Sequence, residues 1–254
     1  DGATVKLKAM AGENWHHLVE WAISQGAFGI ENLALIPGSV GAAPIQTIGA
    51  YGIELEKVLS SVRWLDAESG EFIEYDVDQC QLGYRDSVFK RELKGRAVVT
   101  EVRLNLQRTF NAVLDYGPVA ALKNPTAKNV FDAVCDLRKS KLPEPKATPN
   151  SGRFFKNPVI PKKQFESIKK RYPSVPSYIA TVGCVKLPAA WLIDECGFKG
   201  QWLNGVRIHD QQALVLTNPN RQPLDNILRA AEEISTTVFA KFGVELEIEP
   251  QLLG

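Results

Sequence analysis

The feature that most constrains the fold of this chain is a proline-rich interruption just past its middle. It consists of Leu142-Pro143-Glu144-Pro145 and the polar residues 146–150, which contain a further proline. Proline cannot continue a helix, because it lacks an N–H donor and its ring clashes with the preceding turn. A helix that approaches this point must end there, so we expect a domain on each side, residues 1–145 and residues 146–254.

The composition is that of a globular protein. Of the 254 residues, 44% are hydrophobic and 23% are charged, which is enough material for two modest cores. Thirty basic and twenty-nine acidic residues leave a net charge of +1, so no overall field favours nucleic acid or an anionic membrane. An anionic ligand must therefore be held by local groups.

Cysteine and histidine usage gives no sign of a metal site. Cys80, Cys135, Cys184 and Cys196 lack the close spacing of metal ligands, and the chain has only three histidines. No apolar run approaches the ~20 residues of a membrane span, and the N-terminus has no signal-peptide pattern. We expect a cytoplasmic protein with reduced cysteines and with no metal, nucleic-acid or membrane partner.

Apolar spacing predicts the elements of the first domain. A helix is expected from Asn14, its N-cap, to Gln25, with Gly26 as its end. Thr126 is expected to cap a second helix, which the prolines end. Strands are expected where apolar residues alternate, at residues 5–10, 62–66, 72–77 and 98–106. The first domain is therefore predicted to be α+β, with its strands in the middle.

The second domain is also predicted to be α+β, and to be the smaller of the two. Helical spacing favours residues 162–171, 189–196 and 224–242, with Gly197 ending the second of these. A strand is expected at residues 213–217, and alternation of Val244, Leu246 and Ile248 predicts a closing strand.

A stretch rich in small residues, 37–52, has a composition that suits a ligand. It holds Gly38, Gly41, Gly49 and Gly52, so a flat ring or a phosphate can approach the backbone without meeting a Cβ. Taken alone, such a stretch is more often a series of turns.

Arg85 also has two interpretations from the residues alone. It lies in Gly83-Tyr84-Arg85-Asp86-Ser87, where its planar, permanently charged fork suits a carboxylate. An arginine beside an aspartate is, however, usually a surface ion pair.

Three stretches in this order resemble the UDP-N-acetylenolpyruvoylglucosamine reductase (MurB) family, of the type with a substrate-closing tyrosine. They are Leu35-Ile36-Pro37-Gly38-Ser39-Val40-Gly41-Ala42-Ala43-Pro44-Ile45-Gln46-Thr47-Ile48-Gly49-Ala50-Tyr51-Gly52, Gly83-Tyr84-Arg85-Asp86-Ser87 and Ser151-Gly152-Arg153-Phe154-Phe155-Lys156-Asn157-Pro158, and the likeness runs from Gly12 to Gln251. The resemblance implies an FAD- and NADPH-dependent oxidoreductase of peptidoglycan synthesis, which reduces UDP-N-acetylglucosamine enolpyruvate to UDP-N-acetylmuramate. It also implies that residues 1–145 are a flavin-binding domain and residues 146–254 a substrate-binding domain.

The resemblance assigns roles residue by residue. It makes Arg85 a substrate and enolate stabiliser, and it places Tyr84 beside the flavin. Thr47 stands where the family usually has asparagine. The implied flavin contacts are Ala42, Ala43, Gln46, Gly49, Ala50 and Tyr51. The implied contacts to the UDP-sugar substrate are Tyr116, Arg138, Lys141, Asn157 and Gln212. Cations such as Arg138 and Lys141 at a helix end also complement the helix dipole, so their role has two explanations.

The chain departs from the family at the two acid–base positions. Arg153 stands where the family has the proton-donating serine, and Gln251 stands where it has an assisting glutamate. Arginine keeps its protons at ordinary pH, and an amide exchanges none usefully. Glu249 shares the face of Gln251 in an extended segment, but the family has a glutamate there too and it is not the reacting one. We therefore expect slow turnover.

Two further expectations concern the cofactor and the alternative function. Asp1 is not an initiator methionine, and the family carries its flavin-pyrophosphate loop in a preceding lobe, so we expect a removed segment and weakened FAD retention. The alternative to a reductase is a non-catalytic family member that binds a sugar nucleotide or a protein partner. A globular domain kept only for assembly is the third interpretation.

Overall fold

The computed structural model describes residues 3–115 and 117–252. The chain forms two compact units, Asp1–Arg138 and Lys139–Gly254. The division falls in the last turn of helix α3 (Ala127–Lys141), before the proline-rich interruption at which the sequence places it. The assignment of these units to a flavin and a substrate remains a prediction.

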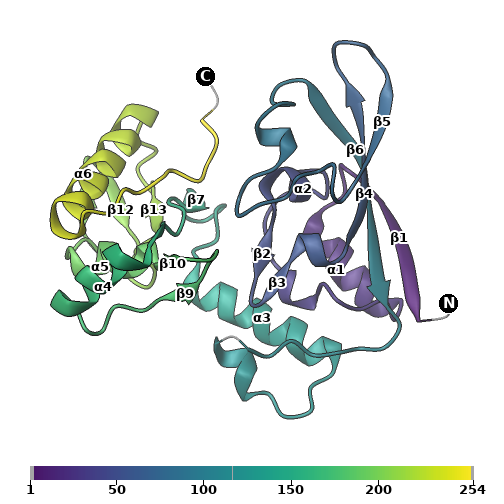
Figure 1. Ribbon diagram of the computed structural model, residues 1–254, viewed down its shortest axis with the longest axis horizontal. Helices are drawn as coiled ribbons and strands as arrows, with labels where there is room; N and C mark the ends of the chain where they lie inside the picture. The colour runs from purple at the N-terminus through teal and green to yellow at the C-terminus, as the bar shows by residue number, and fades with distance from the viewer. Residues whose placement is uncertain (1–2, 116, 253–254) are drawn as a thin grey trace. The chain divides into compact units, whose positions relative to one another are not determined.

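The first unit is built on an antiparallel sheet in the order β1-β6-β4-β5 (Figure 1). Its long central strand β6 pairs with β1 from Thr4↔Gln107 to Met10↔Glu101, and on its other edge with β4. The hairpin predicted around residues 62–77 is confirmed as β4 and β5. The strands are β1 (Thr4–Met10), β4 (Leu59–Asp66), β5 (Phe72–Asp76) and β6 (Ala97–Gln107).

One face of this sheet is buried because its apolar residues alternate along each strand. Val102, Leu104 and Leu106 of β6 are fully buried, while Arg103 and Asn105 between them are partly exposed. Helix α1 (Trp15–Ser24) shares this core. Its predicted cap is confirmed, since Asn14 accepts a hydrogen bond from the His17 amide.

Helix α3 also begins as the sequence predicts. The Thr126 hydroxyl accepts from the Asn129 amide, and the Asn129 side chain accepts from Thr126 N, so two N-terminal donors are satisfied reciprocally. The connections of the first unit hold short elements that the sequence did not predict. They are η1 (Glu31–Leu33), α2 (Ala42–Gln46), β2 (Gly49–Ala50), β3 (Ile53–Glu54), η2 (Leu55–Lys57), η3 (Val88–Lys90) and η4 (Gly117–Ala121).

The second unit contains two small sheets and three helices in its described residues, with a separate core. The predicted helices and the strand before the last helix are confirmed. The first sheet has the order β8-β10-β9 and the second β11-β12-β13-β7. The helices are α4 (Lys162–Arg171), α5 (Ala189–Glu195) and α6 (Leu224–Phe242). The strands are β7 (Asn150–Arg153), β8 (Val159–Pro161), β9 (Tyr178–Ile179), β10 (Cys184–Lys186), β11 (Trp202–Leu203), β12 (Val206–Ile208) and β13 (Val215–Thr217).

The predicted closing strand at residues 244–248 is wrong in its extent. The segment forms a single antiparallel bridge, Phe155↔Ile248, flanked by hydrogen bonds from Lys156 N to Glu247 O and from Glu249 N to Phe154 O. Pro250 follows and has no N–H to donate, so it cannot extend the pairing as a donor. Only this short stretch is tied to its neighbour.

The buried carboxyl of Glu31 gives a test of the first unit. Glu31 is 3% exposed, and burial is the main reason that its pKa is raised above the ordinary value, although its carboxyl accepts from the Gly29 amide. The ionised form is therefore penalised in the folded state. This penalty is absent below the ordinary pKa of 4.5 and is complete above the raised folded pKa.

We expect Glu31→Gln to keep an acceptor for Gly29 N and to remove this penalty. The difference in the free energy of unfolding between variant and parent should shift in favour of the variant as pH rises from about 4 to about 8. Urea unfolding at a series of pH values measures it. Glu20→Gln, an exposed change on α1, is the control, and a pH-independent difference would contradict the account.

Candidate functional site

Arg85 lies at the tip of a tight turn in which it holds an unusual backbone conformation. Gly83 and Asp86 exchange backbone hydrogen bonds of 2.8 and 3.2 Å, which leaves Tyr84 and Arg85 as the two central residues. Arg85 has φ 58°, in the left-handed region that glycine or asparagine normally supplies at the second central position. Strain at a charged residue motivates a functional interpretation.

The guanidinium of Arg85 is held by the glycine-rich stretch. Nη1 donates to Thr47 O at 2.7 Å and Nη2 donates to Gly49 O at 3.1 Å. The Ser87 hydroxyl adds a third link, donating to Ile45 O at 3.1 Å. Two motifs nearly forty residues apart therefore form one local structure, in which the Arg85 side chain is only 11% exposed.

The charges around Arg85 differ from the surface pair that the residues alone suggest. Asp86, its neighbour in sequence, pairs with Arg91 instead. Arg85 Nη1 lies 3.9 Å from Glu54 Oε2, and its Cζ lies 5.3 Å from the centre of the Tyr84 ring. Tyr84 is thus beside the arginine and 37% exposed.

The end of the glycine-rich stretch is a small hairpin. Gly49 pairs with Glu54 and Ala50 with Ile53, so Tyr51 and Gly52 form a two-residue loop with φ 48° and 86°. Both values are positive, as in the turn type that favours asparagine and glycine.

Buried Asn32 fixes this hairpin. It donates to Tyr51 O at 2.8 Å and to Val113 O at 2.9 Å. The sequence did not single out Asn32, because its partners are remote and its surroundings carry no motif.

The residues predicted to contact the flavin lie in α2 and in this hairpin, and they differ in how far they are exposed to solvent. Ala43 is 2% exposed and belongs to the core, so almost none of its surface, backbone included, faces solvent. The others retain partial exposure, and they are Ala42, Gln46, Gly49, Ala50 and Tyr51. Of these residues, Gly49 is joined to the Arg85 turn, since its carbonyl accepts from Arg85 Nη2.

The backbone two residues before the glycine-rich stretch is held at both its N–H and its carbonyl group. Leu35, with φ 54°, donates its N–H to His16 Nδ1 at 3.2 Å. Its carbonyl accepts from Arg138 Nε at 3.1 Å, and the His16 ring stacks on Phe131 with centroids 5.3 Å apart. Arg138, predicted to contact substrate, therefore also has a structural contact within its own unit.

Arg153 and Gln251 lie just beyond the paired stretch of two backbone segments in the second unit. Arg153 is the last residue of β7, opposite Val215, and the next residues pair with the C-terminal segment through Phe155↔Ile248. The pairing reaches as far as the bond from Glu249 N to Phe154 O, one residue from Arg153 and two residues from Gln251. Both side chains are exposed, and neither has a hydrogen bond or ion pair to any other residue that the structure describes.

The loop before Arg153 is shaped by Asn150. Its Oδ1 accepts from Gly152 N at 2.9 Å, and its Nδ2 donates to Thr148 O at 2.7 Å and to Pro143 O at 3.2 Å. Gly152 has φ 72°, which suits glycine. Asn150 is a second positioning residue that sequence analysis missed.

The remaining predicted substrate residues lie in varied settings. Asn157 Oδ1 accepts from Ala189 N at 3.0 Å at the start of α5, and Gln212 Oε1 accepts from Leu214 N at 3.4 Å. Lys141 is exposed at the end of α3. Tyr116 lies outside the described residues. None of these assignments is tested by the structure, and they remain predictions.

Comparison with known proteins now assigns a family. Residues 144–253 match the family described as UDP-N-acetylenolpyruvoylglucosamine reductase, C-terminal domain, and residues 1–76 match the family described as FAD binding domain. A UDP-N-acetylenolpyruvoylglucosamine reductase of Pectobacterium atrosepticum is 48% identical over 98% of this chain and 72% of its own length. One of Pseudoalteromonas atlantica is 44% identical over 98% and 72%.

The chain belongs to the UDP-N-acetylenolpyruvoylglucosamine reductase family.

The fold agrees with this membership. A crystal structure of this reductase (MurB) from Thermus caldophilus matches with a TM-score of 0.66 at 23% identity, covering 98% of this chain and 73% of that one. The α+β class predicted from the sequence is confirmed. The FAD-binding match contains the glycine-rich stretch and the β2–β3 hairpin, and the C-terminal match contains Arg153 and Gln251.

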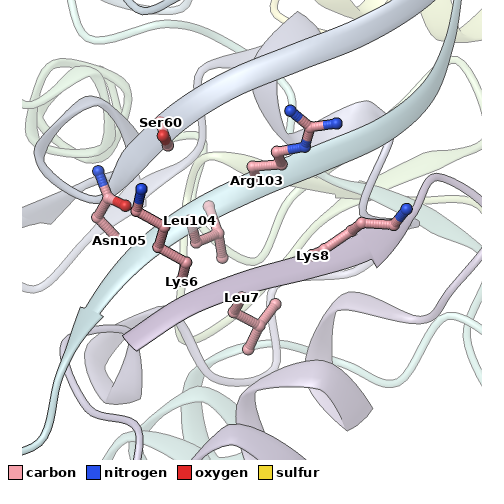
Figure 2. Close-up of a pocket in the computed structure, with 7 residues that line it drawn as sticks. All are labelled: Lys6, Leu7, Lys8, Ser60, Arg103, Leu104 and Asn105. Carbon is pink, nitrogen blue, oxygen red and sulfur yellow. The ribbon is translucent and has the colours of Figure 1, made fainter. Parts of the chain in front are cut away.

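A hollow of about 60 Å³ on the sheet of the first unit involves none of the residues that the family resemblance assigns (Figure 2). Of the cations that line it, Lys8 and Arg103 both pair with Glu101, at 3.1 and 2.7 Å. Their charges are therefore partly neutralised, and we assign the hollow no role.

Neither a metal site nor a membrane span is found in the parts of the chain that the structure describes. No group of three or more His, Cys, Asp or Glu residues there is arranged to hold a metal ion. None of the described helices is both long and apolar enough to cross a bilayer.

The backbone conformation of Thr47 gives a test of strain in the glycine-rich stretch. It follows α2 with φ 45° and ψ 63°, a left-handed conformation that a β-branched residue adopts at a cost of about 1–3 kcal/mol. Asparagine tolerates this conformation, so Thr47→Asn should raise the free energy of unfolding by about 1 kcal/mol while leaving the Thr47 carbonyl in place for Arg85.

Chemical denaturation measures this change. The control is Thr237→Asn, at a helical position where the backbone is not left-handed and no such gain is expected. Equal effects of the two substitutions would contradict the strain at Thr47.

Proposed function

We propose that this chain is a cytoplasmic, FAD- and NADPH-dependent reductase of UDP-N-acetylglucosamine enolpyruvate in peptidoglycan precursor synthesis. The observation that carries the proposal is the arrangement of Arg85. Arg85 lies in a turn with a left-handed backbone, and two carbonyls of the glycine-rich stretch accept hydrogen bonds from its guanidinium. The chain that carries this arrangement is 48% identical to a reductase of this family. Such a fixed, planar cation suits a carboxylate-bearing substrate.

The residues around the β2–β3 hairpin fit a flat ring. Ala50 carries only a methyl group and is partly exposed, and Gly38 has open space where a Cβ would stand. We assign Gln46 and Tyr51 to the same contact surface, and Tyr84 to its edge. FAD, when bound, accepts a hydride from NADPH and passes it to the enolpyruvyl double bond.

Arg85 is proposed to bind the carboxylate of the enolpyruvyl group. Its two-pronged geometry orients that group, and its charge stabilises the negative charge that develops when the double bond is reduced. The carbonyls that hold it reduce the reorganisation that this requires. The diphosphate of the UDP-sugar is assigned to Lys141 and Arg138, and its other contacts to Tyr116, Asn157 and Gln212.

Delivery of the proton is the step in which this chain is impaired. Arg153 keeps its protons and Gln251 has none to give, so neither acts as a general acid. Loss of one such group lowers a rate on the order of 10²- to 10⁴-fold, and two groups that serve one step need not add. Protonation by water is then left as the slow route.

The test has two steps, flavin binding and then repair of the acid–base pair. Purified chain incubated with FAD should gain the visible absorbance of bound flavin, and substrate should reoxidise the reduced flavin slowly in a single turnover. Arg153→Ser combined with Gln251→Glu should increase the rate of product formation by at least about 10²-fold, with a smaller change in flavin binding.

The matched control is Arg171→Ser with Gln211→Glu, which makes the same changes at exposed positions of the same unit. Failure to bind flavin would remove the reductase assignment for this chain. Flavin binding without gain of rate in the repaired variant would show that the two positions are wrongly matched.

A second candidate function, sugar-nucleotide binding without catalysis, is favoured by Arg153 itself. Its guanidinium is exposed and has no ion pair or hydrogen bond to another residue within ranges 3–115 and 117–252, so it is available for a phosphate or carboxylate. An arginine at this position does not serve as a general acid, but it can bind an anion.

Calorimetric titration with UDP-N-acetylglucosamine tests this candidate. We expect binding that Lys141→Ala and Arg153→Ala each weaken about tenfold, as the loss of one charged contact predicts. Lys163→Ala, on the exposed start of α4, is the control. Absence of heat with the parent protein at millimolar ligand would exclude sugar-nucleotide binding.

A further inference from the structure

The position of the Glu54 carboxylate is set by the pairing of β3 with β2 and by the glycine opposite Glu54. In the β2–β3 hairpin Glu54 stands opposite Gly49. A Cβ added to Gly49 would lie 1.7 Å from Glu54 Oε2 and 2.3 Å from its Cδ. The Glu54 carboxylate therefore rests directly over Gly49, in space that any other residue at position 49 would fill.

This carboxylate is one of three oxygens that lie around the Arg85 guanidinium. Two are the carbonyls of Thr47 and Gly49, which accept from Nη1 and Nη2. The third is Glu54 Oε2, at 3.9 Å from Nη1. All three belong to the stretch 47–54, while Asp86 beside the arginine is engaged by Arg91.

We propose that Glu54 is a positioning residue for Arg85. The two carbonyls fix the plane of the guanidinium, and the carboxylate adds a negative charge on the Nη1 side. Because the Glu54 side chain is 53% exposed, its pairing adds little to folding, and its consequence lies in the orientation of Arg85. That this orientation serves substrate binding rests on the proposed function.

The proposal also explains why position 49 is glycine. Its backbone conformation does not require glycine by a positive φ, since Gly49 is absent from the residues with φ above zero. The requirement is instead the space that the Glu54 carboxylate takes. Gly49→Ala should push this flexible carboxylate aside without changing any charge, and so reproduce the effect of removing it.

Arginine-detected NMR of the full chain tests the positioning without any need for activity. Arg85 resonances are assigned by their loss in Arg85→Lys, and rotation about the Cζ–Nε bond is followed by exchange between the two Nη groups. Glu54→Gln keeps the size of the side chain and removes its charge. We expect it to speed this exchange about threefold or more, and Gly49→Ala to do the same.

The double variant Gly49→Ala with Glu54→Gln should be no faster than either single variant, because both remove one interaction. Glu56→Gln, an exposed change two residues away, should leave the exchange unaltered. If Glu54→Gln leaves the Arg85 exchange at the parental rate, or if Glu56→Gln alters it equally, the proposal is overturned. Should Gly49→Ala not fold, the comparison of Glu54→Gln with Glu56→Gln decides alone.

Kinetics of the flavin-loaded chain separate this proposal from the function on which it rests. We expect Glu54→Gln to lower kcat about three- to thirtyfold with KM changed less than twofold, because a misplaced group costs rate more than affinity. A parent chain that binds no flavin removes the proposed function, whereas the NMR result still decides whether Glu54 positions Arg85. An unchanged kcat in an active chain overturns the catalytic consequence.

Discussion

The hydrogen bonds from Arg85 to the carbonyls of Thr47 and Gly49 are the interaction on which the site in the first unit depends. A guanidinium with so little exposed surface must have its donors satisfied, and backbone carbonyls do this without neutralising its charge. The same bonds tie the turn at 83–86 to the stretch at 47–49. Removal of either partner would leave buried polar groups unpaired, so the conformation of the loop and the position of the arginine depend on each other.

Both ends of the glycine-rich stretch are fastened by side chains from elsewhere in the first unit. His16 and Arg138 hold the two backbone groups of Leu35 just before it, and Asn32 holds the carbonyl of Tyr51 at its end. The intervening backbone takes positive φ at several non-glycine residues, Leu35, Thr47 and Tyr51 among them. Strain of this kind persists only where surrounding contacts over-determine the conformation, which these fastenings do.

Much of the fold could be predicted because its longer elements carry their own signals. Apolar residues three and four apart in α1, α3 and α6 define faces that need no knowledge of their partners. Strands of two or three residues, such as β9 and β11, have too few residues to show alternation and depend on neighbours distant in sequence. The predicted closing strand failed for a related reason, since its alternation was present but its pairing partner extended over only one bridge.

In the candidate site, too, some residues are indicated by a sequence pattern and others only by contacts between parts of the chain distant in sequence. Arg85 and the glycine-rich stretch could be proposed from their sequences, whereas Asn32 and Asn150 act through carbonyls and amides that no pattern reveals. Glu54 belongs to this second group, because its importance appears only when the hairpin sets it over Gly49.

In the second unit, the backbone structure around Arg153 and Gln251 does not depend on the side chains at these two positions. The left-handed Gly152, the Asn150 turn and the Phe155↔Ile248 bridge depend on backbone groups and on residues other than Arg153 and Gln251. Both of these side chains are exposed, so neither substitution alters the core or leaves a buried group without a partner. Under the proposed matching, a serine-to-arginine or glutamate-to-glutamine change at such positions would have little effect on stability and a large effect on proton transfer. The fold of this unit is therefore compatible with a full reductase and with a binding protein alike, and the proposed function separates them by whether the groups at these two positions can transfer a proton.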